Sequence, residues 1–337
     1  MHLFVLLFAV KEYNRFYQLL YMYVYSNCFF LRNYIFHDLF IHRIPYSYII
    51  EEEVTYFMFK DKETIIHNGI TIPTLGYRVI PNNGDTYKNT LLALETGYRL
   101  FDIACDAETQ KAFGQALHDS SVERKDIFLI LKVANKNHTY NKAIRGFKNS
   151  LSRCQTDYAD LLLIDWPNPK EYRSTYETSS VETWKAVEDI YKQGSARTIG
   201  VANYESRHIE YLLENCEISP MVNEARIYPG FPFTDNLKCA NEHKIVTAGF
   251  LQDNYKDILQ SKELQIFAEK YNVTAEQICI RYLFEKDCIA LTVGTDKDIL
   301  ASNFHAYDFE LTDKDMAYLD VMKNYGDENI NPDTADF

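Results

Sequence analysis

The sequence has little of what several classes of protein require. Its 337 residues include only 9 prolines and 12 glycines, too few for a collagen-like or low-complexity chain. The seven cysteines are scattered, with no C-x-x-C pair and no zinc-like spacing, so we expect reduced thiols and no bound metal. Positive charge is also in deficit, with a net charge of −13. General affinity for nucleic acid or an anionic membrane surface is therefore excluded.

No apolar run is long enough to span a bilayer, since a transmembrane helix needs about 20 apolar residues. The nearest candidates, 3–10 and 16–31, lie in a leader of 57 residues that holds 17 aromatic side chains. We interpret residues 1–57 as a gene-model extension outside the fold. A weak targeting segment, secretory or membrane-anchoring through residues 1–31, is the alternative, although a basic start and a small-residue cleavage site are absent. We expect a cytoplasmic protein.

From Met58 onward, short apolar runs alternate with segments of helical period. We predict strands at 75–80, 99–102, 127–132, 160–165, 198–201, 221–224, 245–248 and 290–293. We predict helices at 86–96, 109–118, 141–154, 181–193, 206–214, 236–242, 275–285 and 297–303. Eight such units predict an α/β fold, a single (β/α)8 TIM barrel over residues 58–337.

Two additions flank this repeat. Asn68-Gly69 lies between runs 64–67 and 70–73, which predicts a plug hairpin before the barrel, and an extra helix starts near Thr312. An open doubly wound sheet is the competing layout, but its G-x-G-x-x-G fingerprint and the phosphate loop are both missing. The barrel is therefore preferred, with chemistry expected at the carboxyl ends of its strands.

The strand ends carry motifs that resemble the aldo-keto reductase family, in particular its short bacterial-type branch. The motifs are NGITIPTLG (68–76), GYRLFDIA (97–104), FLILKV (128–133), DYADLLLIDWP (157–167), ARTIGVANY (196–204), NFHAYDFELT (303–312) and the closing INPDTADF. The resemblance implies a single-domain barrel that reduces aldehydes and ketones with NADPH. It also implies four catalytic residues at the barrel mouth: an Asp, a Tyr, a Lys and a His.

Only two of these four residues are kept. The resemblance places the family's Asp at Asp102 and its Lys at Lys132, but its Tyr at Ala107 and its His at Asp165. Hydride addition leaves an alkoxide that needs a proton, and Ala107 has none to give. Asp102 and Lys132 are also consistent with a retained ion pair, which is costly to break. We expect Asp165 to share the cation with Asp102 and to be ionised.

The cofactor positions are also altered. The nicotinamide contacts fall on Ala202-Asn203 and Glu224, and the stacking Tyr falls on Gly249. The cations that hold the 2′-phosphate of NADP fall on Val293 and Ile299. Gly294, Thr295 and the amides opening the helix at Lys297 could still hold an anion, and Asn303 matches the adenine contact. NADP(H) is thus the cofactor implied by resemblance, with weak binding expected.

The main interpretation is a catalytically impaired barrel that binds a small molecule or a protein at its mouth, as a monomer. The first alternative is an NAD(P)H-dependent reductase of aldehydes or ketones with a substitute acid, Glu108 or Asp106. The second is an isomerase or lyase that uses Asp165 and Asp102 as an acid–base pair.

Overall fold

The structure, a computed structural model, describes residues 63–81, 84–250, 255–325 and 330–337. All of them belong to one compact unit, Val54–Phe337. The predicted leader, residues 1–57, lies outside the described residues, so its role and the cytoplasmic location stay predictions. No helix in the described part of the chain is long and apolar enough to cross a membrane.

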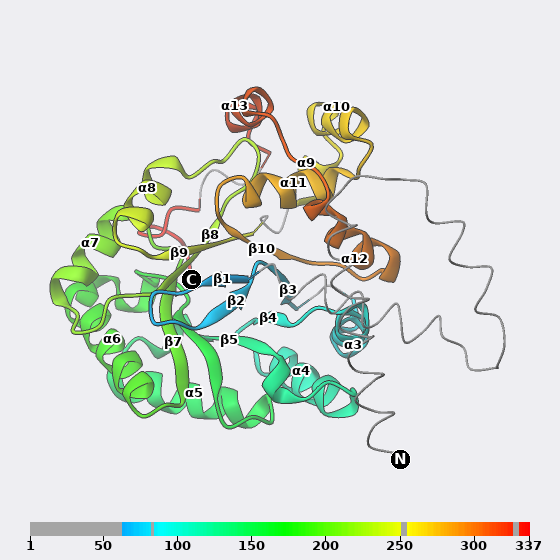
Figure 1. Ribbon diagram of the computed structural model, residues 1–337. Coiled ribbons are helices and arrows are strands. Elements are labelled where there is room, and N and C mark those ends of the chain that lie inside the picture. Colours follow the sequence, from blue (N-terminus) through cyan, green and yellow to red (C-terminus); the bar gives the residue numbers. More distant parts are fainter. Residues whose placement is uncertain (1–62, 82–83, 251–254, 326–329) are drawn as a thin grey trace, which may run out of the picture. The chain divides into compact units, whose positions relative to one another are not determined.

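Eight parallel strands close into a barrel in the order β10-β3-β4-β5-β6-β7-β8-β9 (Figure 1). They are β3 (Leu75–Val79), β4 (Leu100–Ile103), β5 (Phe128–Val133), β6 (Ala159–Ile164), β7 (Ala196–Ala202), β8 (Val222–Arg226), β9 (Val246–Phe250) and β10 (Ile289–Thr292). Every residue of β5 and β6 is buried, as expected for parallel strands covered on both faces. The predicted barrel is confirmed, with each strand within about two residues of its expected position.

Helices surround the barrel (Figure 1). They are α3 (Thr86–Thr96), α4 (Ala107–Asp119), α5 (Tyr140–Arg153), α6 (Tyr176–Lys192), α7 (Ser206–Asn215), α8 (Thr234–Glu242), α9 (Tyr255–Leu259), α10 (Lys262–Tyr271), α11 (Ala275–Phe284), α12 (Lys297–Asn303) and α13 (Asp313–Val321). Short 3-10 turns are η1 (Arg124–Asp126), η2 (Asn135–Asn137), η3 (Lys170–Thr175) and η4 (Phe304–Tyr307). The predicted capping box of Thr274 and Gln277 opens α11, and α13 is the predicted extra helix.

The plug hairpin pairs β1 (Glu63–Ile65) with β2 (Thr71–Pro73). Gly69 takes the left-handed conformation in its turn, with φ +84°, which glycine adopts without strain. Ile66 and Ile72 are fully buried, and the side-chain amide of Asn68 donates to the carbonyl of Arg197 at the start of β7. The hairpin therefore closes the amino end of the barrel and leaves the carboxyl end as the mouth (Figure 1).

Two helices, α9 and α10, were not predicted. They lie between β9 and α11, where the sequence rhythm suggested a connection. Signals for α10 were present: the Ser261 hydroxyl accepts from the amide of Leu264, and Asn272 ends the helix at φ +55°. Figure 1 shows α10 beside α13, where Lys270 forms an ion pair with Asp315. The missed helix thus anchors the C-terminal helix to the barrel.

Candidate active site

A charged cluster fills the lumen just below the mouth. The Nζ atom of Lys132 lies 2.8 Å from Oδ1 of Asp102 and 2.8 Å from Oε1 of Glu224. Arg78 on β3 contacts Oδ2 of Asp102 through Nε at 3.1 Å. Arg78 and Asp102 are register partners on adjacent strands, so their side chains point to the same face of the sheet. Four strands thus contribute to one buried ionic network.

The network sets the charge state of its members. Burial opposes ionisation of Asp102, but Lys132 and Arg78 outweigh it and lower the pKa of its carboxyl. Burial and then repulsion from Asp102 raise the pKa of Glu224 to about 7. Burial alone would lower the pKa of Lys132, yet Asp102 and Glu224 together raise it. At neutral pH the lysine is therefore fully charged, while Glu224 is poised between its acid and carboxylate forms.

Asp165 follows β6 directly and is half-buried at the mouth. Burial raises the pKa of its carboxyl, and the charge of Lys132 offsets only part of that effect. The expectation that Asp165 shares the cation with Asp102 is wrong, because Glu224 occupies the second contact of Lys132. Asp165 instead lies with Oδ2 3.9 Å from Sγ of Cys105. It is a partly exposed carboxyl group whose protonated form is favoured by burial.

Ala107 is the first residue of α4 and lines a pocket beside Lys132. The two acids expected as substitutes flank it but are engaged elsewhere. Oδ1 of Asp106 accepts from the amide of Thr109 at 2.8 Å and caps the helix. Glu108 is exposed and forms an ion pair with Lys111 at 2.9 Å. Neither carboxyl points into the lumen cluster, so neither is the best-placed acid.

The positions assigned to the nicotinamide are only partly available. The side-chain amide of Asn203 donates to the backbone carbonyl of Asp165 at 2.9 Å, and Glu224 is buried against Lys132. The assignment of Gly249 to the stacking aromatic is wrong in this structure. A Cβ at Gly249 would lie 2.4 Å from Cδ2 of Leu283 on α11, so that position faces outward. Its neighbour Phe250 faces the lumen, with the guanidinium of Arg78 4.0 Å from its ring centre.

The anion site expected after the last strand is not supported by the geometry. Oδ1 of Asp296 accepts from the amides of Asp298 and Ile299, which fills the start of α12 with a carboxylate. The carbonyl of Gly294 accepts from Tyr77, and Thr295 is exposed. Asn303 is fully buried, with Nδ2 3.4 Å from the hydroxyl of Tyr98. Acidic groups dominate where the resemblance implied cations.

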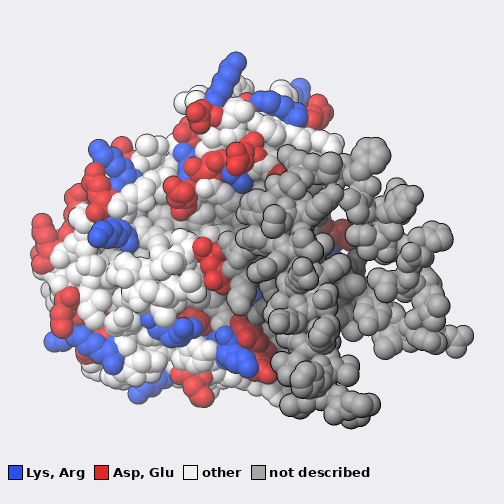
Figure 2. All heavy atoms as spheres, viewed as in Figure 1, with Lys and Arg blue, Asp and Glu red and all other residues white. Residues whose placement is uncertain are grey.

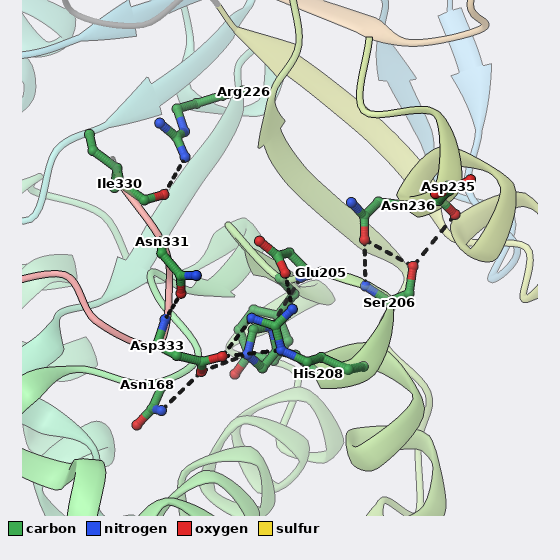
Figure 3. A network of polar contacts seen from close by, with 12 residues as sticks. Asn168, Glu205, Ser206, His208, Arg226, Asp235, Asn236, Ile330, Asn331 and Asp333 are labelled. Carbon is green, nitrogen blue, oxygen red and sulfur yellow. Dashed lines mark hydrogen bonds and ion pairs between the residues drawn. The ribbon is translucent and has the colours of Figure 1, made fainter. Parts of the chain in front are cut away.

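The C-terminal tail lies over the ends of β6 and β7. Figure 3 shows Asp333 at the centre of a polar network: its carboxylate accepts from Asn168 at 3.0 Å and lies 3.0 Å from Nε2 of His208. It also forms an ion pair with Arg207. Burial opposes ionisation, but these partners hold the pKa of Asp333 below its usual value. Sequence reasoning noted the motif of this tail and did not foresee the network.

The described residues contain no cluster of three or more His, Cys, Asp or Glu side chains able to hold an ion. The arrangement offers a carboxyl group, Asp165, whose protonated form burial favours, and the positive charge of Lys132, which acts on that carboxyl. Such a set can donate a proton to a ligand oxygen and stabilise the carboxylate that remains.

Comparisons with known proteins agree with the barrel fold. Residues 81–324 match the model of the aldo/keto reductase family. A glyoxal reductase of Bacillus subtilis (strain 168) is 30% identical over 274 residues, which cover 80% of this chain and 96% of the relative. The crystal structure of an aldo-keto reductase from a Medee basin deep-sea metagenome library superposes with a TM-score of 0.72 at 27% identity, covering 80% and 99% of the two chains. A Bombyx mori aldo-keto reductase in complex with NADP shares the fold, with a TM-score of 0.68 at 23% identity over 77% and 91%.

Proposed function

Because this chain belongs to the aldo/keto reductase family, we propose that it is an NAD(P)H-dependent oxidoreductase that reduces aldehydes or ketones, with Asp165 as the proton donor. The observation that carries the proposal is the environment of Asp165: the ammonium group of Lys132 contacts the carboxyl groups of Asp102 and Glu224 instead of Asp165, and burial raises the pKa of Asp165. The glyoxal reductase among its relatives supports a small carbonyl substrate. We also propose that the chain acts as a monomer.

Proteins of this family typically bind NADP(H), and the described residues fit the two ends of that cofactor unequally. The lumen-facing ring of Phe250 suits the nicotinamide ring, whereas the side-chain amide of Asn203 donates to Asp165. Apolar Ile299 and the carboxylate of Asp296 at α12 do not suit a 2′-phosphate. When bound, the dinucleotide supplies the hydride that attacks the carbonyl carbon. We therefore propose that NADH is accepted at least as well as NADPH.

The chain's own residues handle the proton. Asp165 donates it to the carbonyl oxygen, and the charge of Lys132 stabilises the carboxylate that forms. Asp102 and Glu224 hold Lys132 in place through ion pairs. Because Asp165 is partly exposed, it can regain its proton from solvent. A raised pKa suits this role, since a general acid works best with a pKa near the working pH.

The test is steady-state reduction of methylglyoxal and 4-nitrobenzaldehyde by the full chain with NADH and with NADPH. Asp165→Asn should lower kcat by about 100-fold or more, the usual contribution of a general acid. The wild-type rate should fall as pH rises through the pKa of Asp165, since only the protonated form donates. Glu108→Gln is the matched control for the alternative acid and should leave kcat unchanged. An unchanged rate in Asp165→Asn would refute the assignment.

A second candidate is a binding protein with impaired catalysis, and Ala107 favours it because the family's usual acid is missing there. In that case wild-type turnover of 4-nitrobenzaldehyde stays below about one per second, against a typical enzyme rate of about 10 per second. Dinucleotide or ligand binding would still be seen by nicotinamide fluorescence. Dependence of any residual rate on Asp165 separates the two candidates.

A further inference from the structure

A pocket of about 310 Å³ lies to one side of the barrel mouth. Its walls are the start of α4, the turn η2 and one side of α5. Five of the residues that line it are cations, and they are Lys132, Lys136, Lys142, Arg145 and Arg153. The lining includes a single acid, Asp106. This concentration of positive charge occurs in a chain whose net charge is −13, whereas acidic and basic side chains are interspersed on the face in Figure 2.

Three of these cations are not neutralised by the surrounding protein. Arg153 donates from Nη1 to Oε1 of Gln110, a neutral partner. Lys136 and Arg145 have no acidic partner within the described part of the chain, and both are exposed. The carboxylate of Asp106 is directed to the amide of Thr109. Like charges gathered around one cavity repel each other, so a bound anion would reduce the repulsion between these cations.

The other two cations that line the pocket are paired with acidic side chains. Lys142 pairs with the exposed carboxylate of Glu171 at 3.2 Å and donates to the hydroxyl of Tyr172. Lys132 forms the inner end of the pocket and is held by the lumen acids. The cations at the rim of the pocket are therefore exposed, whereas the ammonium group at its inner end is buried.

Small side chains make the space. Ala107 lines the pocket where the resemblance implied a tyrosine, and that larger side chain would occupy part of this volume. Gly146 on α5 leaves room for Asn137, because a Cβ there would lie 2.3 Å from Nδ2 of that side chain. Ala107 therefore accounts for two features: the family's tyrosine is missing, and space is left in the cationic pocket.

We propose that this pocket binds a small molecule that carries a phosphate group. Arginine side chains bind phosphate through paired N–H groups, and lysines add point charges. The volume matches the lower end of pockets that bind small organic ligands, so it accepts a phosphate monoester rather than only a bare ion. The pocket shares Lys132 with the proposed catalytic site, but none of the expected dinucleotide positions lines it.

The experiment is isothermal titration of the full chain, without dinucleotide and at low ionic strength, with inorganic phosphate, glycerol 3-phosphate and malonate. We expect glycerol 3-phosphate to bind with a Kd of about 1 mM or tighter, inorganic phosphate more weakly, and malonate weakest. Absence of measurable phosphate binding overturns the proposal. Malonate binding as tight as glycerol 3-phosphate overturns the choice of phosphate.

Two variants place the binding. Lys136→Gln combined with Arg145→Gln should weaken glycerol 3-phosphate binding by about 100-fold, since one charged hydrogen bond contributes about tenfold or more. Lys148→Gln is the matched control: it removes an exposed cation from the same helix but does not line the pocket. Equal losses in the control and the double variant would show nonspecific charge attraction and overturn the site.

A final measurement separates this site from the proposed function. The double variant should bind NADH and NADPH as the wild type does, and should reduce an uncharged aldehyde at the wild-type rate. Loss of dinucleotide affinity in parallel with phosphate affinity would mean that the pocket belongs to the cofactor site, which overturns the inference. Failure of aldehyde reduction in the wild type leaves the phosphate titration unaffected.

Discussion

Two regions at the carboxyl end of the barrel differ in the sign of their charge. Around β5 and α5, the basic side chains of Lys136, Arg145 and Arg153 face a pocket. After β10, the carboxylate of Asp296 occupies the amides that open α12. The resemblance implied the reverse, with cations after the last strand. The comparison teaches that the concentration of positive charge in this barrel lies beside α5, and not after the last strand, where the resemblance implied it.

The largest expected effect comes from the buried cation on the β5 side. Lys132→Met should lower the free energy of unfolding by about 3–5 kcal/mol, because Asp102 and Glu224 lose the partner that offsets their burial. Lys297→Met, an exposed cation on the β10 side, should change it by less than about 0.5 kcal/mol. Chemical denaturation measures both. Similar losses in the two variants would break the comparison.

The pH dependence of stability tests the same network. The pKa of Glu224 is raised from 4.5 to about 7 in the folded protein. Its contribution is therefore fully present below pH 4.5 and is lost as pH rises through about 7. As pH rises from 4.5 to about 7, the free energy of unfolding of the wild type should fall by about 1–3 kcal/mol relative to that of Glu224→Gln.

Unfolding curves for both proteins at pH 5 and pH 8 give this difference. Asp102 acts in the other direction, with a lowered pKa, but its contribution is lost below its usual pKa of 3.8 and lies outside the window. A constant difference between the two proteins across the window would contradict the raised pKa.

The next two variants differ in the space available for a new tyrosine side chain. Gly249→Tyr should destabilise the fold by about 1–3 kcal/mol, because its side chain would enter the space of Leu283. Ala107→Tyr should cost less than about 1 kcal/mol, because position 107 borders the pocket. Thermal unfolding compares the two. If Gly249→Tyr is neutral, position 249 faces the mouth after all.

The smallest effect is on cofactor choice. Val293→Lys with Ile299→Arg should raise NADPH affinity about tenfold, or about 1.4 kcal/mol, and leave NADH affinity unchanged. The capping carboxylate of Asp296 limits the gain. Nicotinamide fluorescence titrations measure both affinities. A wild type that already prefers NADPH strongly would show that the β10 side still binds the 2′-phosphate.

The fold was predictable because strand and helix periods repeat eight times and turn residues separate them. The hairpin at Asn68-Gly69 and the capping box at Thr274 each depend on a few adjacent residues, and local chemistry determined both. The two missed helices, α9 and α10, interrupt that period. Their segment breaks the alternation of strands and helices. The helix-capping residue Ser261 was the sequence signal that could have predicted α10.

The site was less predictable, because charge state depends on neighbours far apart in the chain. Sequence placed Asp102 and Lys132 correctly at the strand ends, but paired Asp165 with them. The structure gives that place to Glu224, which is 92 positions from Lys132. Which of two adjacent strand residues faces the lumen, as with Gly249 and Phe250, can be decided only when the register of the barrel is known. The cationic pocket depends on α5 packing beside α4, which no linear motif encodes.

The pairing of β10 with β3 has a consequence for how the chain reaches this state. Thr292 donates to the carbonyl of Gly76 across 216 positions, so the barrel closes only after the last strand is available. Contacts between such distant segments slow folding. Until closure, the edge of β3 stays unpaired and is open to association with other chains.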